Sequence, residues 1–409
     1  MEEKRFNEVS STSDNNNWDI HIAREKPLYK RENDIRSPYE RDYTRILHSL
    51  AYRRLKHKTQ VFFNIDNDHI CTRMEHVQHV ESVSCTIAKY LGLNVDLTKA
   101  IATGHDLGHA PFGHEGEVEL TKIREENGLD KFWHERNGLR VVDKLELLEN
   151  EKRNYCNLDL TYAVRDGIIS HCGEVDENGI KPRKSAIDLN TFSTSGEYQP
   201  FTWEGCVVKI SDKIAYLGRD IEDAVRLHFL TRQDLFELGR ISKKYGQKAI
   251  NTTVIMHNFI ISICENSSPE SGIRLGDEYN DLLNEIKAYN YDKIYRNKKF
   301  DVYRNYVKSL IRSIYMVLIE AYDTQNTITS LLKLKKVYPK LINDFIDYLD
   351  KYVYLDLLGE HPGKYKRYNN DKIYGSLETK IIYLQAIIDF IAGMTDRYAI
   401  EVYNELLKY

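Results

Sequence analysis

The segment from about Val207 to Phe229 constrains the fold most, because its apolar residues recur at steps of three and four. These residues are Val207, Ile210, Ile214, Leu217, Ile221 and Ala224. Such spacing places them along one side of an α-helix. The same periodicity predicts further helices over residues 38–58, 73–91, 97–108, 308–322, 341–354 and 378–407. Alternation typical of strands is confined to short, hairpin-sized pieces. With only eight prolines and 21 glycines in 409 residues, the sequence predicts a mostly α protein.

The composition indicates a globular protein of the reducing cytosol. Hydrophobic residues make up 42% of the chain and charged residues 29%, which argues against general disorder. The six cysteines are scattered and form no Cys-x-x-Cys pair, so neither a disulfide framework nor a thiolate zinc site is expected. No signal-peptide-like or membrane-spanning apolar run is present, which predicts a soluble, cytoplasmic protein. The polar start of the chain predicts a loose N-terminal arm over residues 1–35.

Positive charge is concentrated near the N-terminus. Residues 26–58 contain ten Lys or Arg and four Asp or Glu, although the whole chain carries a net charge of −4. A basic stretch of this kind suits phosphate groups on a nucleotide or a nucleic acid. A solvated helix face or an oligomer contact is the alternative on charge alone.

Histidines cluster in one part of the chain. Seven of the fourteen lie between His69 and His134, which is about a sixth of the length. The adjacent pair His105 and Asp106 offers an imidazole nitrogen and a carboxylate oxygen, which together suit Mn, Fe, Ni or Zn. His76 lies near the apolar stripe of the preceding helix, so it is expected to face inward. The alternative for a single buried histidine is a core residue that only makes hydrogen bonds.

A second polar set lies on the Val207–Phe229 helix. At about 100° per residue, Asp212 falls on the side opposite Ile210 and Ile214. Tyr216, Arg219 and Asp220 follow on the side of Asp212. Considered alone, this helix could instead present a solvated polar face.

Five ordered blocks resemble the deoxyguanosine triphosphate triphosphohydrolase (dGTPase) family of the HD-domain metal phosphohydrolases. The blocks cover Arg36 to Phe62, the histidine cluster, Tyr162 to His171, Glu204 to Tyr216 and Asp389 to Ala399. The resemblance implies an HD-domain helical core over residues 36–240. It also implies a helical C-terminal region over residues 241–409, which packs on the core and completes the site or forms oligomer contacts.

The resemblance also implies site residues. The metal ligands would be His76, His105, Asp106 and Asp212. The matched catalytic residues are His114, Glu117 and His134, to which His109 is added as a further candidate of the histidine cluster. Phosphate contacts would be Arg73, Lys213 and Tyr216. The groups that hold the sugar 3′-hydroxyl would be Gln60 and Asp220.

Physical chemistry supports these roles. A triphosphate carries close to four negative charges, so attack at its α-phosphorus needs a metal ion and cations such as Arg73 and Lys213. The leaving 5′-oxygen needs a proton, and His114 beside Glu117 is the predicted donor. His109 and His134 could instead only order water around the site.

The implied reaction converts a deoxynucleoside triphosphate (dNTP) into deoxynucleoside and tripolyphosphate, with Mn or Mg expected as the metal and Fe, Co or Ni as alternatives. Two other functions stay open: an HD phosphatase or phosphodiesterase, and a regulator that binds nucleotides or single-stranded DNA. The family also implies a homo-oligomer (dimer, tetramer or hexamer) and an allosteric dNTP or single-stranded DNA as a further partner. Leu217-Gly218-Arg219 replaces a commoner Ile-Asn-His, and the chain is shorter than well-known bacterial dGTPases. A strict preference for dGTP is therefore not predicted.

Overall fold

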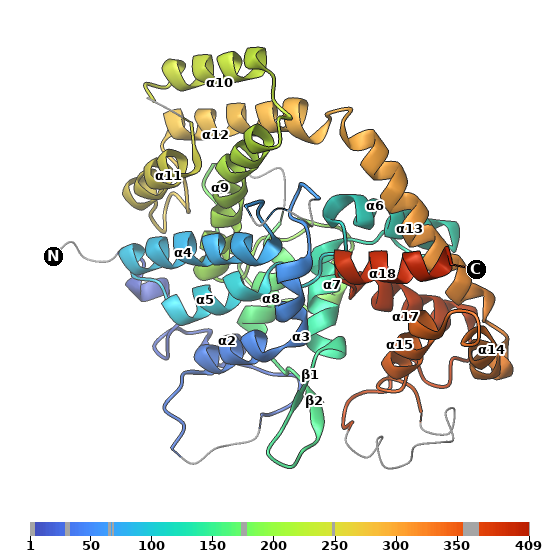
Figure 1. The fold of residues 1–409 in the computed structure, drawn as a ribbon. Coiled ribbons are helices and arrows are strands. Elements are labelled where there is room, and N and C mark those ends of the chain that lie inside the picture. The colour runs from blue at the N-terminus through green and yellow to red at the C-terminus, as the bar shows by residue number, and fades with distance from the viewer. Residues whose placement is uncertain are drawn as a thin grey trace. The chain divides into compact units, whose positions relative to one another are not determined.

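The computed structural model describes residues 5–28, 33–63, 67, 69–172, 178–247, 250–354 and 368–408. Helices dominate this part of the chain (Figure 1). Its one sheet is a hairpin, in which β1 (Leu147–Glu149) pairs antiparallel with β2 (Tyr155–Asn157). The prediction of a mostly α protein is therefore confirmed. In the described part of the chain, no helix combines the length and the apolar character needed to cross a membrane.

The chain forms two compact units, each built from separate stretches of sequence. Unit 1 comprises Met1–Leu47, Gln60–Asp106 and Asp159–Val302, and unit 2 comprises His48–Thr59, Leu107–Leu158 and Tyr303–Tyr409. Neither unit follows the predicted division at residue 240. The boundary at Asp106 instead separates the His105–Asp106 pair from the histidines that follow it.

Unit 1 is organised around α4 (Arg73–Leu91), which packs against both α5 (Val95–Gly104) and α9 (Trp203–Arg226) (Figure 1). α4 begins with a capping box, in which the Glu75 carboxylate accepts the backbone N–H of Thr72 at 2.8 Å. It ends at Gly92, whose φ of 88° suits a residue without a side chain. The start and end of α4 match the predicted helix over residues 73–91.

α5 and α8 (Tyr162–Ser170) approach each other closely through a reciprocal glycine contact. A side chain at Gly104 would lie 2.9 Å from Ile168, and one at Gly167 would lie 2.6 Å from Ile101. Each glycine therefore accommodates an isoleucine of the other helix. This packing fixes the ends of the two helices, where His105 and His171 follow.

Unit 1 also holds most of the N-terminal stretch. Phe6 is fully buried, and the buried Glu204 carboxylate accepts the backbone N–H groups of Ser11 and Asn94 at 2.9 Å each. The structure therefore differs from the expected loose arm for residues 5–28, because apolar and polar contacts hold them to the core. The remaining elements of the unit are η1 (Asn7–Val9), α1 (Trp18–His21), α2 (Pro38–His48), η4 (Leu189–Thr191), α10 (Arg232–Lys244), α11 (Thr252–Asn266), α12 (Asp277–Asn290) and η5 (Tyr291–Tyr295).

Unit 2 holds the hairpin and two sets of helices. The first set is α3 (Leu50–Arg54), η2 (Leu55–His57), α6 (Gly113–Glu126), α7 (His134–Arg140) and the π-helical segment η3 (Val141–Leu145). The second set is most of α13 (Phe300–Glu320), η6 (Thr324–Asn326), α14 (Thr327–Leu334), α15 (Pro339–Leu349), α17 (Lys380–Ala392) and α18 (Asp396–Leu406). Asp389 of α17, in the second set, pairs with Arg140 of α7, in the first: its carboxylate accepts a hydrogen bond from the Arg140 guanidinium at 2.7 Å.

Two predicted helices are interrupted by capping side chains. The helix predicted over residues 38–58 is divided at Ser49, which adopts an extended backbone and accepts the Tyr52 N–H with its hydroxyl at 3.1 Å. The helix predicted over residues 378–407 is divided before Thr395, which caps α18 through the Tyr398 N–H at 3.2 Å. Hydrophobic periodicity continues across both breaks and therefore conceals them.

Candidate metal centre

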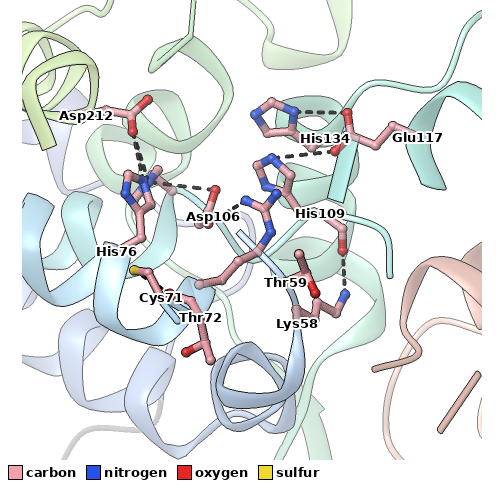
Figure 2. Close-up of polar contacts among 12 residues, drawn as sticks. Lys58, Thr59, Cys71, Thr72, His76, Asp106, His109, Glu117, His134 and Asp212 are labelled. Carbon is pink, nitrogen blue, oxygen red and sulfur yellow. Dashed lines mark hydrogen bonds and ion pairs between the residues drawn. The ribbon is translucent and has the colours of Figure 1, made fainter. Parts of the chain in front are cut away.

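Three helices of unit 1 bring the predicted metal ligands together. The Nε2 atom of His76 on α4 lies 2.9 Å from the Asp212 carboxylate on α9 (Figure 2). His105 follows α5 directly, and its Nε2 lies 3.8 Å from a carboxylate oxygen of both Asp106 and Asp212. One ligand atom from each of His76, His105 and Asp212 lies within 4.8 Å of the other two. The structure thus brings three of the four predicted ligands together, and Asp106 lies beside them through its contact with His105.

The backbone fixes which nitrogen of His105 faces the site. Its Nδ1 lies 2.7 Å from the carbonyl of Ala102, and a carbonyl can only accept, so Nδ1 carries the hydrogen. Nε2 therefore presents a lone pair. That atom is buried and has no hydrogen-bond partner among the described residues. A buried nitrogen in this state is costly unless a ligand satisfies it.

Asp106 is held by a buried cation. The Arg73 guanidinium, at the start of α4, donates to the Asp106 carboxylate at 2.9 Å, and both residues are almost completely buried. Arg73 was predicted to contact phosphate, and in this structure it orients a predicted metal ligand. Its Nε is buried without a partner in the described part of the chain, so the guanidinium keeps an unused donor.

These residues fit a divalent metal ion. Two imidazoles and two carboxylates form a mixed nitrogen and oxygen donor set, which suits Mn, Fe, Co, Ni or Zn. The lone pair on His105 Nε2 has the orientation that a metal ligand needs, because its other nitrogen is fixed on the backbone. Arg73 supports Asp106 in the same way from outside the ligand set.

Burial and charged neighbours shift the pKa values of these side chains. Burial disfavours a charged His76, but its hydrogen bond to Asp212 outweighs burial and raises the pKa of His76. Burial likewise opposes the charged form of Asp212, yet the contacts with His76 and His105 hold its pKa below the usual range. The pKa of His105 is lowered by burial. The hydrogen bond between His76 and Asp212 therefore favours the charged form of each side chain.

A second carboxylate of α9 is in a different state. Asp220 is buried, and burial raises its pKa to about 7. The Tyr295 hydroxyl, at the end of the π-helical segment η5, donates to it. The sequence interpretation missed Tyr295, because no periodic pattern signals a π-helical end. Such segments are frequent at functional sites.

The other predicted substrate contacts also lie in unit 1. Gln60 keeps its Oε1 buried with no hydrogen-bond partner among the described residues, so it has an acceptor to offer. Lys213 and Tyr216 are half-buried on α9, after Asp212. Lys213, Tyr216 and Asp220 follow Asp212 at intervals that keep them within about two helical turns of it.

The predicted catalytic residues of unit 2 form a separate cluster. Glu117 of α6 lies 3.5 Å from His109 Nε2 and 3.3 Å from His134 Nδ1 (Figure 2). The two imidazole rings stack with centroids 3.7 Å apart and an interplanar angle of 25°. We call these three residues the Glu117 cluster. Gly108 allows it to form, because a side chain there would lie 2.0 Å from the carbonyl of His134.

His114 is not part of this cluster. Its side chain is exposed near the start of α6, and no hydrogen bond or ion pair to Glu117 is found in the described part of the chain. The structure therefore differs from the expected His114–Glu117 pair.

The start of α6 is set by Phe112. Its φ of 63° lies in the left-handed region that bulky residues avoid, and its backbone N–H donates to the Asp396 carboxylate at 2.7 Å.

The basic N-terminal stretch binds acidic groups of the chain itself. Arg36 lies 2.9 Å and Arg41 3.5 Å from Asp34, and Arg54 of unit 2 lies 2.7 Å from Glu146. This use of charge favours a structural role for much of the stretch.

Unit 2 also contains a cavity of about 550 Å³ lined by several tyrosines, and none of the predicted site residues borders it.

Comparisons with known proteins show the family of this chain. The family model described as an HD domain matches residues 73–217, and the one described as a phosphohydrolase-associated domain matches residues 374–405. The chain is 35% identical over 375 residues to a deoxyguanosinetriphosphate triphosphohydrolase-like protein of Caldanaerobacter subterraneus subsp. tengcongensis, covering 91% of this chain and 86% of that one. It is 30% identical to a protein of the same description from Pelagibacter ubique, covering 95% of this chain and 99% of the relative. The chain belongs to the dGTPase-like family of HD-domain proteins. Membership makes it a phosphohydrolase of a metal-dependent class.

The six cysteines all lie in the described part of the chain, where they form no disulfide.

Proposed function

We propose that this dGTPase-like protein hydrolyses dNTPs to deoxynucleoside and tripolyphosphate. The observation that carries the proposal is the buried, unpartnered Nε2 of His105 beside the carboxylates of Asp106 and Asp212. The names of the relatives indicate the same class of reaction. The preferred base is left open, so one or several dNTPs are substrates.

The metal centre would act on the phosphates. His76, His105, Asp106 and Asp212 would hold a divalent ion, with Mn or Mg expected. When bound, such an ion lowers the pKa of its water and offsets charge on phosphate oxygens. Arg73 orients Asp106 and keeps one donor for a phosphate oxygen, and Lys213 and Tyr216 supply further donors.

The Glu117 cluster would supply the proton for the leaving 5′-oxygen. Glu117 contacts two stacked imidazoles, and the stack disfavours a charge on both rings at once. The cluster therefore suits the gain and loss of one proton, with the carboxylate stabilising the charged ring. His114, which the resemblance assigns to this role, is the alternative donor.

The sugar would be held by Gln60 and Asp220. Gln60 offers an unpartnered buried acceptor as well as its amide N–H groups, and Asp220 offers a carboxyl group that Tyr295 already orients. A 3′-hydroxyl can donate to one of these groups and accept from the other. This pairing supports a deoxynucleoside triphosphate rather than a substrate without sugar.

Product analysis tests the proposal. Each of the four dNTPs is incubated with the purified protein and Mn²⁺ or Mg²⁺, singly and in mixtures, and products are separated by chromatography. Tripolyphosphate and deoxynucleoside in equal amounts are expected, and Asp106→Ala is expected to yield neither. Release of phosphate or pyrophosphate would instead indicate a phosphatase or phosphodiesterase. Binding of nucleotide without any product would indicate a regulator.

The mixtures also test regulation. If one dNTP speeds the hydrolysis of another, the result would support an allosteric nucleotide. Adding single-stranded DNA to the same assay tests whether DNA is a partner. Homo-oligomer formation and cytoplasmic location remain predictions, which light scattering and cell fractionation would check.

A further inference from the structure

His171, which is not among the predicted site residues, occupies a position equivalent to that of a metal ligand. It follows the last residue of α8 as His105 follows the last residue of α5. Its Nδ1 lies 2.7 Å from the carbonyl of Ile168, three residues back, as the Nδ1 of His105 lies 2.7 Å from the carbonyl of Ala102. Two helices of unit 1 thus end in histidines held in the same way by their own backbones.

The helix packing brings these two histidines together. Gly104 and Gly167 each accept an isoleucine of the opposite helix, directly before the histidines. The two rings meet edge to face, with centroids 4.9 Å apart and an interplanar angle of 76°. His171 is 1% exposed, so a polar ring has been buried beside the metal ligands at a cost in solvation.

His171 stands outside the ligand group itself. The candidate ligand group formed by His76, His105 and Asp212 does not include His171. Its ring nevertheless contacts that of His105, one member of the group. Contact with a ligand from outside the ligand group is the usual arrangement of a residue that orients a metal site.

We propose that His171 is a positioning residue of the metal centre, whose ring fixes the orientation of His105. The edge-to-face contact restricts rotation of the His105 ring, while the bond to Ala102 fixes its tautomer. Together they hold Nε2 toward Asp106 and Asp212. This inference rests on the proposed metal-dependent function, but its test requires no substrate.

Manganese binding to the metal-free protein tests the role. The probe is Mn²⁺ alone, added to chelator-treated full-length protein, and the free ion is measured by its electron paramagnetic resonance signal. His171→Asn keeps an N–H that can reach the Ile168 carbonyl but removes the ring. We expect its Kd for Mn²⁺ to rise about 10–100-fold, the usual effect of losing an outer partner of a metal ligand.

Ser170→Ala is the matched control. Ser170 is buried one residue before His171, and its hydroxyl donates to the Asp166 carbonyl at 2.6 Å. Its loss is expected to lower the melting temperature of the metal-free protein without changing the Kd for Mn²⁺. His171→Asn is expected to show the reverse pattern.

An unchanged Kd for Mn²⁺ in His171→Asn would overturn the proposal and limit His171 to ending α8. If that variant does not fold, Gly167→Ala takes its place, because a side chain there meets Ile101 and displaces α8 from α5. Unchanged affinity in Gly167→Ala would also overturn the proposal. A wild-type protein that binds no Mn²⁺ would overturn the metal centre together with the role of His171. Normal Mn²⁺ binding without release of tripolyphosphate would contradict the proposed function alone.

Discussion

The candidate metal centre of unit 1 and the Glu117 cluster of unit 2 combine the same kinds of side chain in different geometries. Each contains two histidines and a carboxylate whose ligand atoms lie within 4.8 Å of one another. In the metal centre the rings meet edge to face with centroids 5.5 Å apart, and in the Glu117 cluster they stack at 3.7 Å. The comparison teaches that two groups of the same composition can differ in how their rings are oriented.

The origins of the residues also differ. His76 and Asp212 are 136 residues apart, whereas the Glu117 cluster is contained between residues 109 and 134. In the metal centre a backbone carbonyl fixes His105, so a lone pair is left facing the carboxylates. In the Glu117 cluster the carboxylate itself lies against both imidazoles, so a mobile proton can be stabilised.

The largest effects are expected when one carboxylate is removed from each region, and these two variants test the comparison directly. Asp212→Asn is expected to weaken Mn²⁺ binding by more than about 100-fold, beyond the usual effect of an outer partner, because a charged ligand is lost. Glu117→Gln is expected to keep Mn²⁺ but to lower turnover. Metal content after gel filtration and the rate of tripolyphosphate release measure both. Loss of Mn²⁺ from Glu117→Gln would show that the Glu117 cluster is also a metal site.

The second prediction concerns which histidine supplies the proton. His134→Ala is expected to lower kcat by about 10²–10⁴-fold, the scale of general acid catalysis, with little change in KM. His114→Ala is expected to have a smaller effect on kcat, because the exposed His114 side chain makes no hydrogen bond or ion pair with Glu117 in the described part of the chain. A greater loss in His114→Ala than in His134→Ala would return the role to His114, as the resemblance implies.

The third prediction uses the sugar. Loss of the 3′-hydroxyl leaves buried polar groups of Gln60 and Asp220 unpaired, at about 1–3 kcal/mol each. We expect ddGTP to be at least about tenfold poorer than dGTP in kcat/KM. Tyr295→Phe removes the donor that orients Asp220 and should reduce this discrimination. Steady-state kinetics on both nucleotides measure it, and equal rates on the wild-type enzyme would contradict the sugar assignment.

The smallest effect is expected from the ionisation of Asp220. Its pKa is about 7 in the folded protein and near 3.9 when unfolded, so the folded state binds the proton more tightly. The free energy of unfolding therefore falls as the pH rises from about 4 to about 7. Asp220→Asn is neutral throughout, so its stability relative to wild type should grow by up to about 1.4 kcal/mol per pH unit across that range.

Denaturant unfolding of the metal-free protein at several pH values measures this difference. Asp277→Asn is a suitable control, since the Asp277 side chain is 89% exposed at the start of α12. Its effect should not change with pH in the same way. A constant difference between Asp220→Asn and wild type would show that Asp220 is ionised in the folded protein at every pH tested.

The sequence predicted helices well where an apolar stripe and a cap agree. α4 carries both and was placed at its observed ends, whereas α9 begins at Trp203, four residues before the predicted start. The capping hydroxyl of Thr202 explains that difference. The packing of residues 5–28 was missed, because Phe6 packs against Trp203 and Ser11 binds Glu204, and no local pattern reports contacts between such distant residues.

The residues proposed as metal ligands could be named from the sequence because residue type and order carry the signal. The partners that orient them could not. Arg73 was expected at phosphate but binds Asp106, and Tyr295 reaches Asp220 across 75 residues through a π-helical end. His171 depends on the reciprocal contact of Gly104 and Gly167, which only the packed helices reveal.

The separation of His76 from Asp212 has a consequence for synthesis of the protein. At about 5–20 residues per second, the ribosome produces Asp212 roughly 7–27 s after His76. Once Asp106 has been made and until Asp212 follows, the nascent chain offers two histidines and one carboxylate, a nitrogen-rich set that favours Ni²⁺ over Mn²⁺. We expect Asp212→Asn, which resembles this incomplete set, to retain Ni²⁺ better than Mn²⁺ in a competition experiment. The last carboxylate to emerge would then decide which ion the finished enzyme keeps.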